Sequence, residues 1–287
     1  MKPGHKALLA GLASLLALTL LITYQQQLLR FFKPAPAAAP AGEAPADPDP
    51  PEEESIWQKV TVEARLLEAG TDRETPLYII TAPEEGPTVM VIGGVHGDEP
   101  AGYEAAQVVS TWLVDRGTLL VLPRANALAV ATGTRYPEGT LNLNRIFPGN
   151  AAGSPTERLA ASIFAVMAEY RPLWVVDLHE ARVFEHLQFD ALGQTIIYPE
   201  DGEQIELIEW IIAGMNSSIT EKLHQFQVKR GGVIGGTIYA SRLLQLESFT
   251  VETTQELPLQ DRINQHLDAV RLLLSSLGVA VNETGLE

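Results

Sequence analysis

The sequence contains no cysteine, which excludes disulfide bonds, thiolate metal ligands and a cysteine nucleophile. A metal ion in this protein would therefore need histidine and carboxylate ligands. Basic residues are also few, since 20 lysines and arginines stand against 36 aspartates and glutamates, which gives a formal net charge of -16. Because nucleic-acid binding needs a basic surface for the phosphates, we expect no nucleic-acid partner.

Residues 1–33 have the pattern of a membrane anchor. Lys2 and Lys6 precede the apolar run ALLAGLASLLALTLLITY, which is about long enough to cross a bilayer, where a helix needs ~17 to 25 apolar residues. A cleavable signal peptide is the alternative, but no Ala-x-Ala cleavage site follows the run before Lys33. We therefore predict an uncleaved transmembrane helix and a single-pass membrane protein whose body lies outside the cytoplasm.

The composition changes again after this segment. Residues 34–55 are rich in proline and alanine and then acidic, so we expect an extended spacer that buries no core.

From residue 56 to residue 287, strand-like and helix-like segments alternate, as in a mostly parallel α/β sheet. Helices are predicted from residue 100, at 154–170 and near the carboxyl end, and strands at 61–70, 76–82, 88–95, 117–123, 173–179, 194–199 and 247–253.

Three of the predicted strands end in ionisable residues. His96 and Glu99 follow the strand TVMVIGGV, His179 ends LWVVDLH, and Glu252 lies in ESFTVET. Strand ends of a parallel sheet gather at one edge, where catalytic groups collect. Two histidines and one glutamate are the protein ligands of a catalytic zinc site, and Glu252 would be free to act as a base. The alternative for His96 and Glu99 is a surface turn that opens a helix at Pro100.

A predicted loop, TRYPEGTLNLNRIFPGN, adds cationic and amide side chains to this region. It carries Arg135, Asn144 and Arg145. The forked donors of arginine suit a carboxylate or a developing oxyanion. Two arginines near a metal site in an acidic protein indicate an anionic substrate.

These motifs, HGDE, TRY followed by LNLNRIFPG, DLHE and FTVET, resemble those of the zinc carboxypeptidase clan, in particular its succinylglutamate desuccinylase and aspartoacylase branch. The resemblance spans residues 93–253 and implies an α/β/α sandwich around a mixed, mainly parallel sheet. It implies one Zn²⁺ held by His96, Glu99 and His179. It further implies that Glu252 is the general base and acid, that Arg135 polarises the scissile carbonyl, and that Asn144 and Arg145 hold the free carboxylate of the substrate.

The chain departs from the family pattern at Asn142, where many relatives have an aspartate beside a zinc histidine. An amide there is expected to support the ligand less well than a carboxylate, because such partners raise its basicity. The segment after Glu252 has room for one closing helix, whereas the deacylase branch usually adds a small β domain.

Several other residues have open interpretations. Asp177 is either a partner of a zinc histidine or a satisfied residue at a strand end, and His266 is expected to be a surface or packing residue. The segment GGVIGGT, residues 231–237, is predicted to be a flexible loop by the cleft with no helix behind it. Tyr239, which follows it, is a candidate for substrate contact.

Two classes of function remain. The favoured one is a zinc-dependent amide hydrolase that cleaves next to a free carboxylate. Within it, a metallocarboxypeptidase acting on small peptides outside the cytoplasm is preferred to a deacylase of N-acyl amino acids. The other class is an anchored binding module without catalysis, against which the presence of Glu252 argues.

Overall fold

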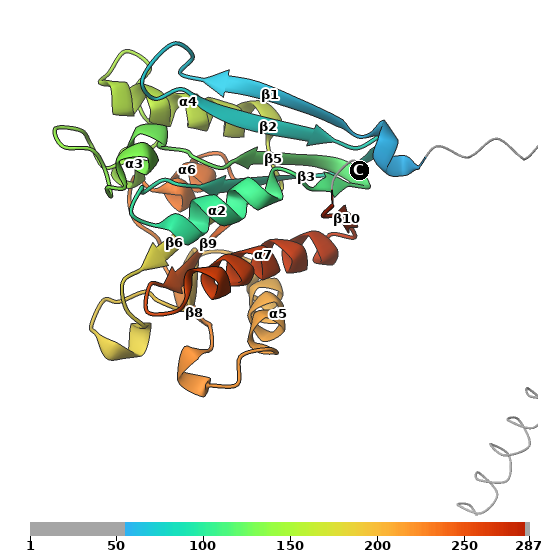
Figure 1. The fold of residues 1–287 in the computed structure, drawn as a ribbon, viewed down its shortest axis with the longest axis vertical. Coiled ribbons are helices and arrows are strands. Elements are labelled where there is room, and N and C mark those ends of the chain that lie inside the picture. Colours follow the sequence, from blue (N-terminus) through green and yellow to red (C-terminus); the bar gives the residue numbers. More distant parts are fainter. Residues whose placement is uncertain (1–54, 285–287) are drawn as a thin grey trace, which may run out of the picture. The chain divides into compact units, whose positions relative to one another are not determined.

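The structure is a computed structural model that describes residues 55–284 (Figure 1). The predicted transmembrane helix and nearly all of the predicted spacer lie outside the described residues, so both stay predictions. No helix within residues 55–284 is long and apolar enough to cross a membrane.

The centre of the fold is an eight-stranded mixed sheet. Four neighbouring pairs are parallel, β3 with β5, β3 with β6, β6 with β9 and β7 with β8, and the other three are antiparallel. In spatial order the strands are β1 (Thr61–Leu67), β2 (Thr75–Thr81), β5 (Arg116–Leu122), β3 (Glu84–Gly93), β6 (Trp174–Ala181), β9 (Glu247–Thr254), β7 (Thr195–Tyr198) and β8 (Gln227–Arg230). A second sheet pairs β4 (Leu113–Val114) with β10 (Val281–Asn282).

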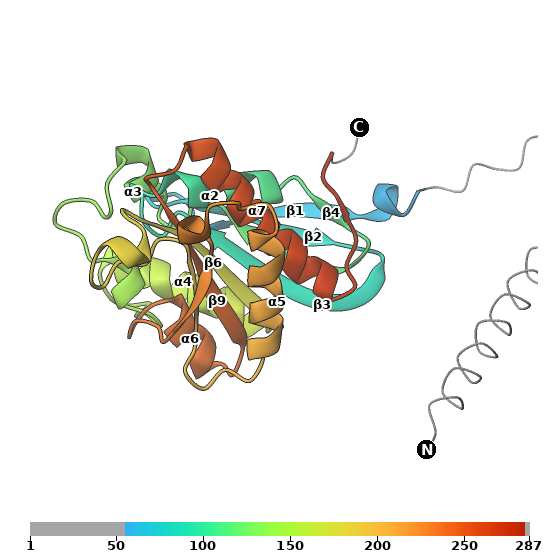
Figure 2. The same cartoon turned by 90° about the horizontal axis from the view of Figure 1, so that it is seen from below.

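Helices cover both faces of the main sheet, as Figures 1 and 2 show. One face packs against α2 (Pro100–Val109), α5 (Ile205–Asn216) and α7 (Leu259–Ser276), and the other against α4 (Pro155–Tyr170) and α6 (Thr237–Leu243). The remaining helices are α3 (Ala127–Thr132) and the short 3-10 turns η1 (Ile56–Lys59), η2 (Leu143–Arg145), η3 (Glu185–Leu187) and η4 (Lys222–His224).

Strand β3 shows how the sequence produces these layers. Successive side chains of a strand point to opposite faces, and every second residue of the apolar run packs into a different core. Val89 and Val91 lie in the core beneath α2, α5 and α7, whereas Met90 and Ile92 lie in the core beneath α4. The expected α/β fold with helices on both faces of a mixed, mainly parallel sheet is therefore confirmed.

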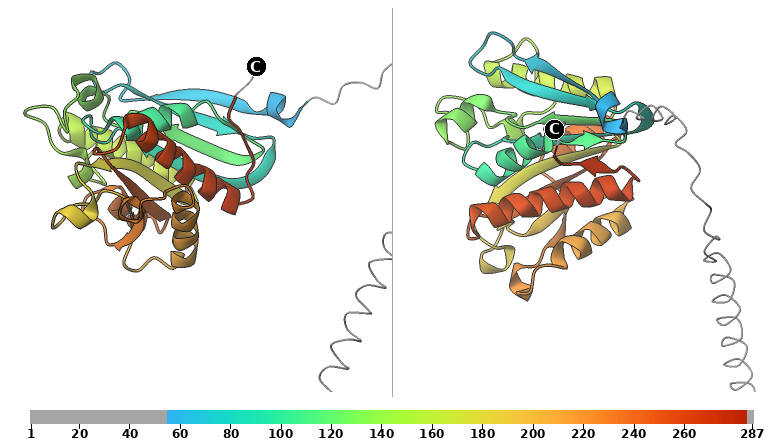
Figure 3. Two further views of the ribbon diagram at one scale, coloured as in Figure 1. Left: turned by 60° about the horizontal axis from the view of Figure 1, so that its bottom comes forward. Right: turned by 45° about the vertical axis from the view of Figure 1, so that its right-hand side comes forward.

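The predicted elements are largely present. All seven predicted strands exist, and the closing helix is α7, which runs beside α2 and α5 (Figure 3). Helix α4, predicted at residues 154–170, begins with a capping box, since the backbone N–H of Ser154 donates to the Glu157 carboxylate at 2.8 Å and the N–H of Glu157 donates to the Ser154 hydroxyl at 3.4 Å. The prediction that no helix follows GGVIGGT was wrong, because α6 begins at Thr237.

Candidate metal centre and active-site cleft

The turn between β3 and α2 holds the first two candidate ligands. Glu99 occupies the N-cap position of α2, and His96 lies three residues before it, so the helix begins as the sequence predicts. Gly97 is required in this turn, because a Cβ there would lie 1.9 Å from the carbonyl oxygen of Ala129. Both side chains are buried, with 1% of His96 and 3% of Glu99 exposed, so the surface-turn interpretation is wrong.

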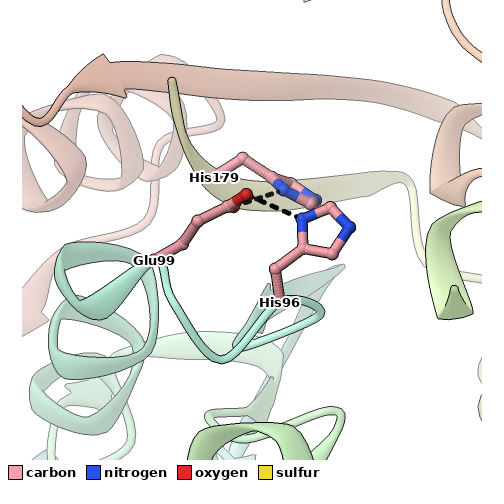
Figure 4. Close-up of side chains that lie close together, drawn as sticks. All are labelled: His96, Glu99 and His179. Carbon is pink, nitrogen blue, oxygen red and sulfur yellow. Dashed lines mark hydrogen bonds and ion pairs between the residues drawn. The ribbon is translucent and has the colours of Figure 1, made fainter. Parts of the chain in front are cut away.

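His179 comes to the same point from the end of β6 (Figure 4). The carboxylate of Glu99 lies between the two imidazoles, with Oε1 2.7 Å from His96 Nδ1 and Oε2 2.8 Å from His179 Nδ1. One potential ligand atom from each residue lies within 4.8 Å of the others. The three residues could therefore bind one metal ion together.

The second ring nitrogen of each histidine, Nε2, also has a hydrogen-bond partner. His179 Nε2 lies 2.8 Å from Asp177 Oδ2, and His96 Nε2 lies 3.1 Å from Asn142 Oδ1. Asp177 in turn accepts a hydrogen bond of 2.6 Å from the hydroxyl of Thr237. Each imidazole thus directs its Nδ1 toward the cluster and its Nε2 to an oxygen acceptor outside it, which is the usual arrangement of metal-bound histidine. The donor set fits a divalent ion, and Asp177 is a partner of the candidate ligand His179.

The electrostatics of the cluster are dominated by burial and by mutual contact. Burial disfavours the Glu99 carboxylate, but the two histidines outweigh this and hold its pKa well below the usual range. Burial likewise opposes a charge on His179, whereas the carboxylates of Asp177 and Glu99 raise its pKa well above the usual value. Without a metal, the negative carboxylates of Glu99 and Asp177 and the positive charge on His179 therefore stabilise one another.

Glu252 lies beside this cluster on β9, directly opposite His179 in the strand register. Its side chain is buried, with 8% of the residue exposed, and burial together with the negative charges of Glu99 and Asp177 raises its pKa to about 8. A divalent cation nearby would favour the ionised form instead. The charge of the Glu252 carboxyl group therefore depends on whether the neighbouring cluster holds a cation.

A cleft of about 190 Å³ opens next to the cluster. His96 and Glu252 line it together with three candidates from the predicted loop, Arg135, Asn144 and Arg145. Tyr239 does not line it; that side chain borders two neighbouring hollows instead. The structure therefore brings together all of the sequence-derived candidates except Tyr239.

A family model for the Succinylglutamate desuccinylase/Aspartoacylase catalytic domain matches residues 85–276. The chain belongs to this family. The matched range contains every residue of the metal cluster and the cleft described above. The resemblance drawn from the four motifs is confirmed.

Curated relatives of the chain include a deacetylase and a succinylglutamate desuccinylase. It is 33% identical over 144 residues to the N-alpha-acetyl-L-2,4-diaminobutyric acid deacetylase of Halomonas elongata, a match that covers 48% of this chain and 38% of that protein. It is 32% identical over 142 residues to the succinylglutamate desuccinylase of Burkholderia cenocepacia. That match covers 43% of this chain and 38% of that protein. The chain thus spans well under half the length of these relatives.

Solved structures share the fold. The mDAP-bound form of Helicobacter pylori Csd4, a D,L-carboxypeptidase, has a TM-score of 0.63 at 20% identity, over 69% of this chain and 52% of that one. A succinylglutamate desuccinylase/aspartoacylase from Rhodobacter sphaeroides has a TM-score of 0.58 at 19% identity, over 77% of this chain and 66% of that one. At these identities the likeness establishes the fold alone.

The glycine-rich segment before α6 packs directly on the loop that carries Asn144 and Arg145. A Cβ at Gly236 would lie 2.6 Å from Asn144 Oδ1, and one at Gly235 would lie 2.2 Å from the carbonyl oxygen of Arg145. The backbone of Gly235 also has a positive φ of 76°, a conformation that favours glycine. The two glycines allow the close approach that shapes this wall of the cleft.

Sequence reasoning did not foresee the positions of several charged residues, and it left the position of His266 open. Lys229 and Arg230 line the cleft from β8, whose short polar sequence QVKR gave no strand signal. Arg262 on α7 forms a buried ion pair with Glu180, the residue after His179. His266 is fully buried and lies 3.2 Å from the hydroxyl of Thr253, so it packs in the core and is not a surface residue.

Proposed function

We propose that this protein is a zinc-dependent amide hydrolase that cleaves next to a free carboxylate and acts as a metallocarboxypeptidase on small peptides. The observation that carries the proposal is the placement of Glu252 between the His96, Glu99 and His179 cluster and a cleft with cationic walls. Zinc is the ion of choice because the set of two histidines and one carboxylate, without cysteine, matches a catalytic zinc site.

One Zn²⁺ per chain would supply the Lewis acidity that activates water and polarises a carbonyl group. Glu252 takes up the proton of the attacking water on its carboxylate and returns it to the leaving amine. Its burial on β9 beside the cluster keeps the carboxyl group close to the point of attack and shields it from bulk water. A binding module without catalysis would have no need for this residue.

The loop side chains divide the remaining tasks. Arg135 lies next to the cluster, where its guanidinium donates to Glu99 Oε1 at 2.6 Å, so it is close enough to stabilise the oxyanion that develops on the carbonyl. Asn144 and Arg145 line the cleft and hold the free carboxylate of the substrate. The substrate is thereby oriented with its terminal amide at Glu252.

A second hollow supports peptides as substrates. It measures about 380 Å³ and is lined by Glu99, Arg135 and Glu252 together with residues 180–183, Gln188 and residues 190–192. This space adjoins the reacting groups, is not lined by Asn144 or Arg145, and is larger than an acetyl or succinyl group needs. Deacylation of N-acyl amino acids is the second candidate, and the names of the curated relatives favour it.

The test uses the protein with Zn²⁺ and a panel of dipeptides and N-acyl amino acids, each with a free or an amidated carboxylate. Release of the terminal residue from the free forms, with a loss of ~10-fold or more on amidation, would support the carboxylate clamp. Arg145→Ala should weaken binding of the free form and make amidation nearly neutral. Equal turnover of free and amidated substrates by the unchanged protein would refute the proposal.

We further propose that residues 1–33 anchor the protein in a membrane with the catalytic body outside the cytoplasm. The apolar run supports the anchor, and the orientation rests on a small excess of positive charge, Lys2, Lys6 and the amino terminus before the run against Arg30 and Lys33 after it. Protease protection of the full chain in right-side-out vesicles tests it. Protection of the catalytic body from external protease would contradict the predicted orientation.

A further inference from the structure

Strand β1 forms one edge of the main sheet (Figure 1). Six of its seven residues are exposed, whereas every residue of its neighbour β2 is buried or half-buried. Within residues 55–284, β2 is the one strand that pairs with β1, so the outer side of β1 presents backbone N–H and C=O groups that no described strand engages. The strand also precedes residues 85–276, which the family model matches, so membership of the family does not account for it.

The two faces of β1 differ in chemistry, because successive side chains of a strand alternate between faces. Val62, Ala64 and Leu66 lie on one face, where Val62 and Leu66 are each 49% exposed. Glu63 and Arg65 lie on the other face, which is the side of α4. Two exposed aliphatic side chains in so short a strand would be stabilised by burial against a partner.

The charged face contains a carboxylate without a cation. Glu63 forms no hydrogen bond or ion pair with any residue that the structure describes. Arg65 Nη1 donates to Glu169 Oε2 on α4 at 2.6 Å, and both of these side chains stay partly exposed. A guanidinium group has five N–H donors, so Arg65 can bind a second carboxylate from outside.

The sequence of β1, TVEARLL, is complementary to itself in one antiparallel register. When Ala64 of one copy lies opposite Ala64 of a second copy, Val62 lies opposite Leu66 and Glu63 opposite Arg65. Each of these contacts occurs twice, because the two copies are related by a two-fold axis. Opposite residues of antiparallel strands contact each other on the same face, where apolar pairs and pairs of opposite charge are stabilising.

The neighbouring registers lack this match. A two-fold axis perpendicular to the sheet places one residue opposite its own copy, so the next registers set Glu63 against Glu63 or Arg65 against Arg65. Like charges directly opposite each other are destabilising. Charged residues on an edge strand often prevent pairing, but here they have opposite signs and match in the register centred on Ala64. The sequence thus favours one register over its neighbours.

We propose that two copies of this chain associate through β1 and join their sheets across a two-fold axis at Ala64, with Glu63 of each copy bound to Arg65 of the other. The association leaves the active-site cleft accessible from both copies, since no residue of β1 lines it. The inference goes beyond the proposed reaction and does not depend on it.

The experiment uses cysteine cross-linking, because the chain has no cysteine of its own. In the proposed register the two Ala64 Cα atoms lie about 4.5 to 5.5 Å apart, which suits a disulfide bond. We expect the full-length Ala64→Cys chain, purified in detergent and oxidised, to form a disulfide-linked dimer. Val62→Cys is the matched control, since its two copies lie about 13 Å apart along the strand and cannot be bridged. The double variant Val62→Cys, Leu66→Cys should form the linked dimer again.

Charge exchange tests the pairing of Glu63 with Arg65. Glu63→Arg sets two guanidinium groups opposite each other, so dimerisation of the otherwise unchanged chain should weaken by about 10-fold or more in analytical ultracentrifugation. Arg65→Glu should weaken it as well. An equal mixture of the two variants restores opposite charges at both contacts and should recover dimerisation, which would also show that both variants are folded.

Equal cross-linking of Ala64→Cys and Val62→Cys, or none with either, would overturn the inference. A dimer that forms without the Ala64 disulfide would use another surface of the chain and would overturn it as well. Dimerisation that Glu63→Arg leaves unchanged would contradict the charge pairing. Linkage through Ala64→Cys but not through Val62→Cys, together with recovery in the mixture, would support both the surface and the register.

Discussion

The buried ion pair between Arg262 and Glu180 joins the closing helix α7 to the metal centre. Glu180 Oε2 also accepts a hydrogen bond of 2.7 Å from the backbone N–H of Ala101 in α2, and the backbone N–H of Glu180 donates to Glu99 at 3.1 Å. Arg262 is 8% exposed and Glu180 is 4% exposed. Removing the arginine leaves a buried carboxylate without its cation, which typically costs about 3 to 5 kcal/mol.

We therefore expect Arg262→Met to lower the free energy of unfolding at pH 8 by about 3 to 5 kcal/mol, and the melting temperature by about 6 to 20 °C for a domain of this size. Burial already raises the pKa of Glu180, and loss of the arginine raises it further. An acid whose pKa is raised on folding stabilises the fold at low pH and loses that contribution as the pH rises. The destabilisation should therefore be smaller at pH 5 than at pH 8.

Urea denaturation of the single variants and the double variant measures the effect. Arg262→Met combined with Glu180→Gln should recover most of the loss, because the amide still accepts from Ala101 and carries no charge. Arg271→Met is the control on the same helix, where the partners Asp268 and Glu283 are partly exposed, and it should cost about 0 to 1 kcal/mol. A loss below about 1 kcal/mol for Arg262→Met at pH 8, or one independent of pH, would refute the reasoning.

Three further predictions concern the metal centre and the core behind it. His96→Ala should lose the bound zinc, because the site keeps two of its three ligands, and full zinc occupancy by metal analysis would contradict the ligand set. Glu252→Gln should keep the metal while kcat falls by about 10²- to 10⁴-fold, so a near-normal kcat would place the base elsewhere. Burial lowers the pKa of His266 to about 3, so the unfolded state takes up a proton first as the pH falls below its ordinary value. His266→Gln should therefore reduce the loss of unfolding free energy between pH 6 and pH 3, by up to about 1.4 kcal/mol per pH unit, and an unchanged slope in urea titrations would count against this.

The sequence was informative where one local pattern determines one structure. The apolar runs that lead to His96, His179 and Glu252 correctly predicted the strands β3, β6 and β9, because a strand buried on both faces needs a continuous apolar run. Glu99 and Pro100 marked the beginning of α2 for the same kind of local reason. The convergence of these residues followed from one rule, that parallel strands present their carboxyl ends at the same edge of the sheet.

What the sequence did not show depends on pairing between distant segments. Strand β8 is short and polar, and it becomes a strand because β7 offers it a parallel edge, so Lys229 could not be placed in the cleft beforehand. Tyr239 was a candidate because it follows the glycines, but the helix that begins at Thr237 turns its side chain away from the cleft. The partner of Glu180 comes from a helix 82 residues further along the chain, and no local pattern indicates such a pair.

The amide at Asn142 fits the charge balance of the centre. A divalent ion and Arg135 would bring three positive charges to this region, and Glu99, Asp177 and ionised Glu252 would bring three negative ones. An aspartate at position 142 would add a fourth negative charge at a half-buried position beside His96. Asn142 keeps the acceptor for His96 Nε2 at 3.1 Å without that charge. In the zinc-bound form proposed here, the departure from the family pattern thus preserves the orientation of the histidine, and what it gives up is the additional basicity that a carboxylate would confer on it.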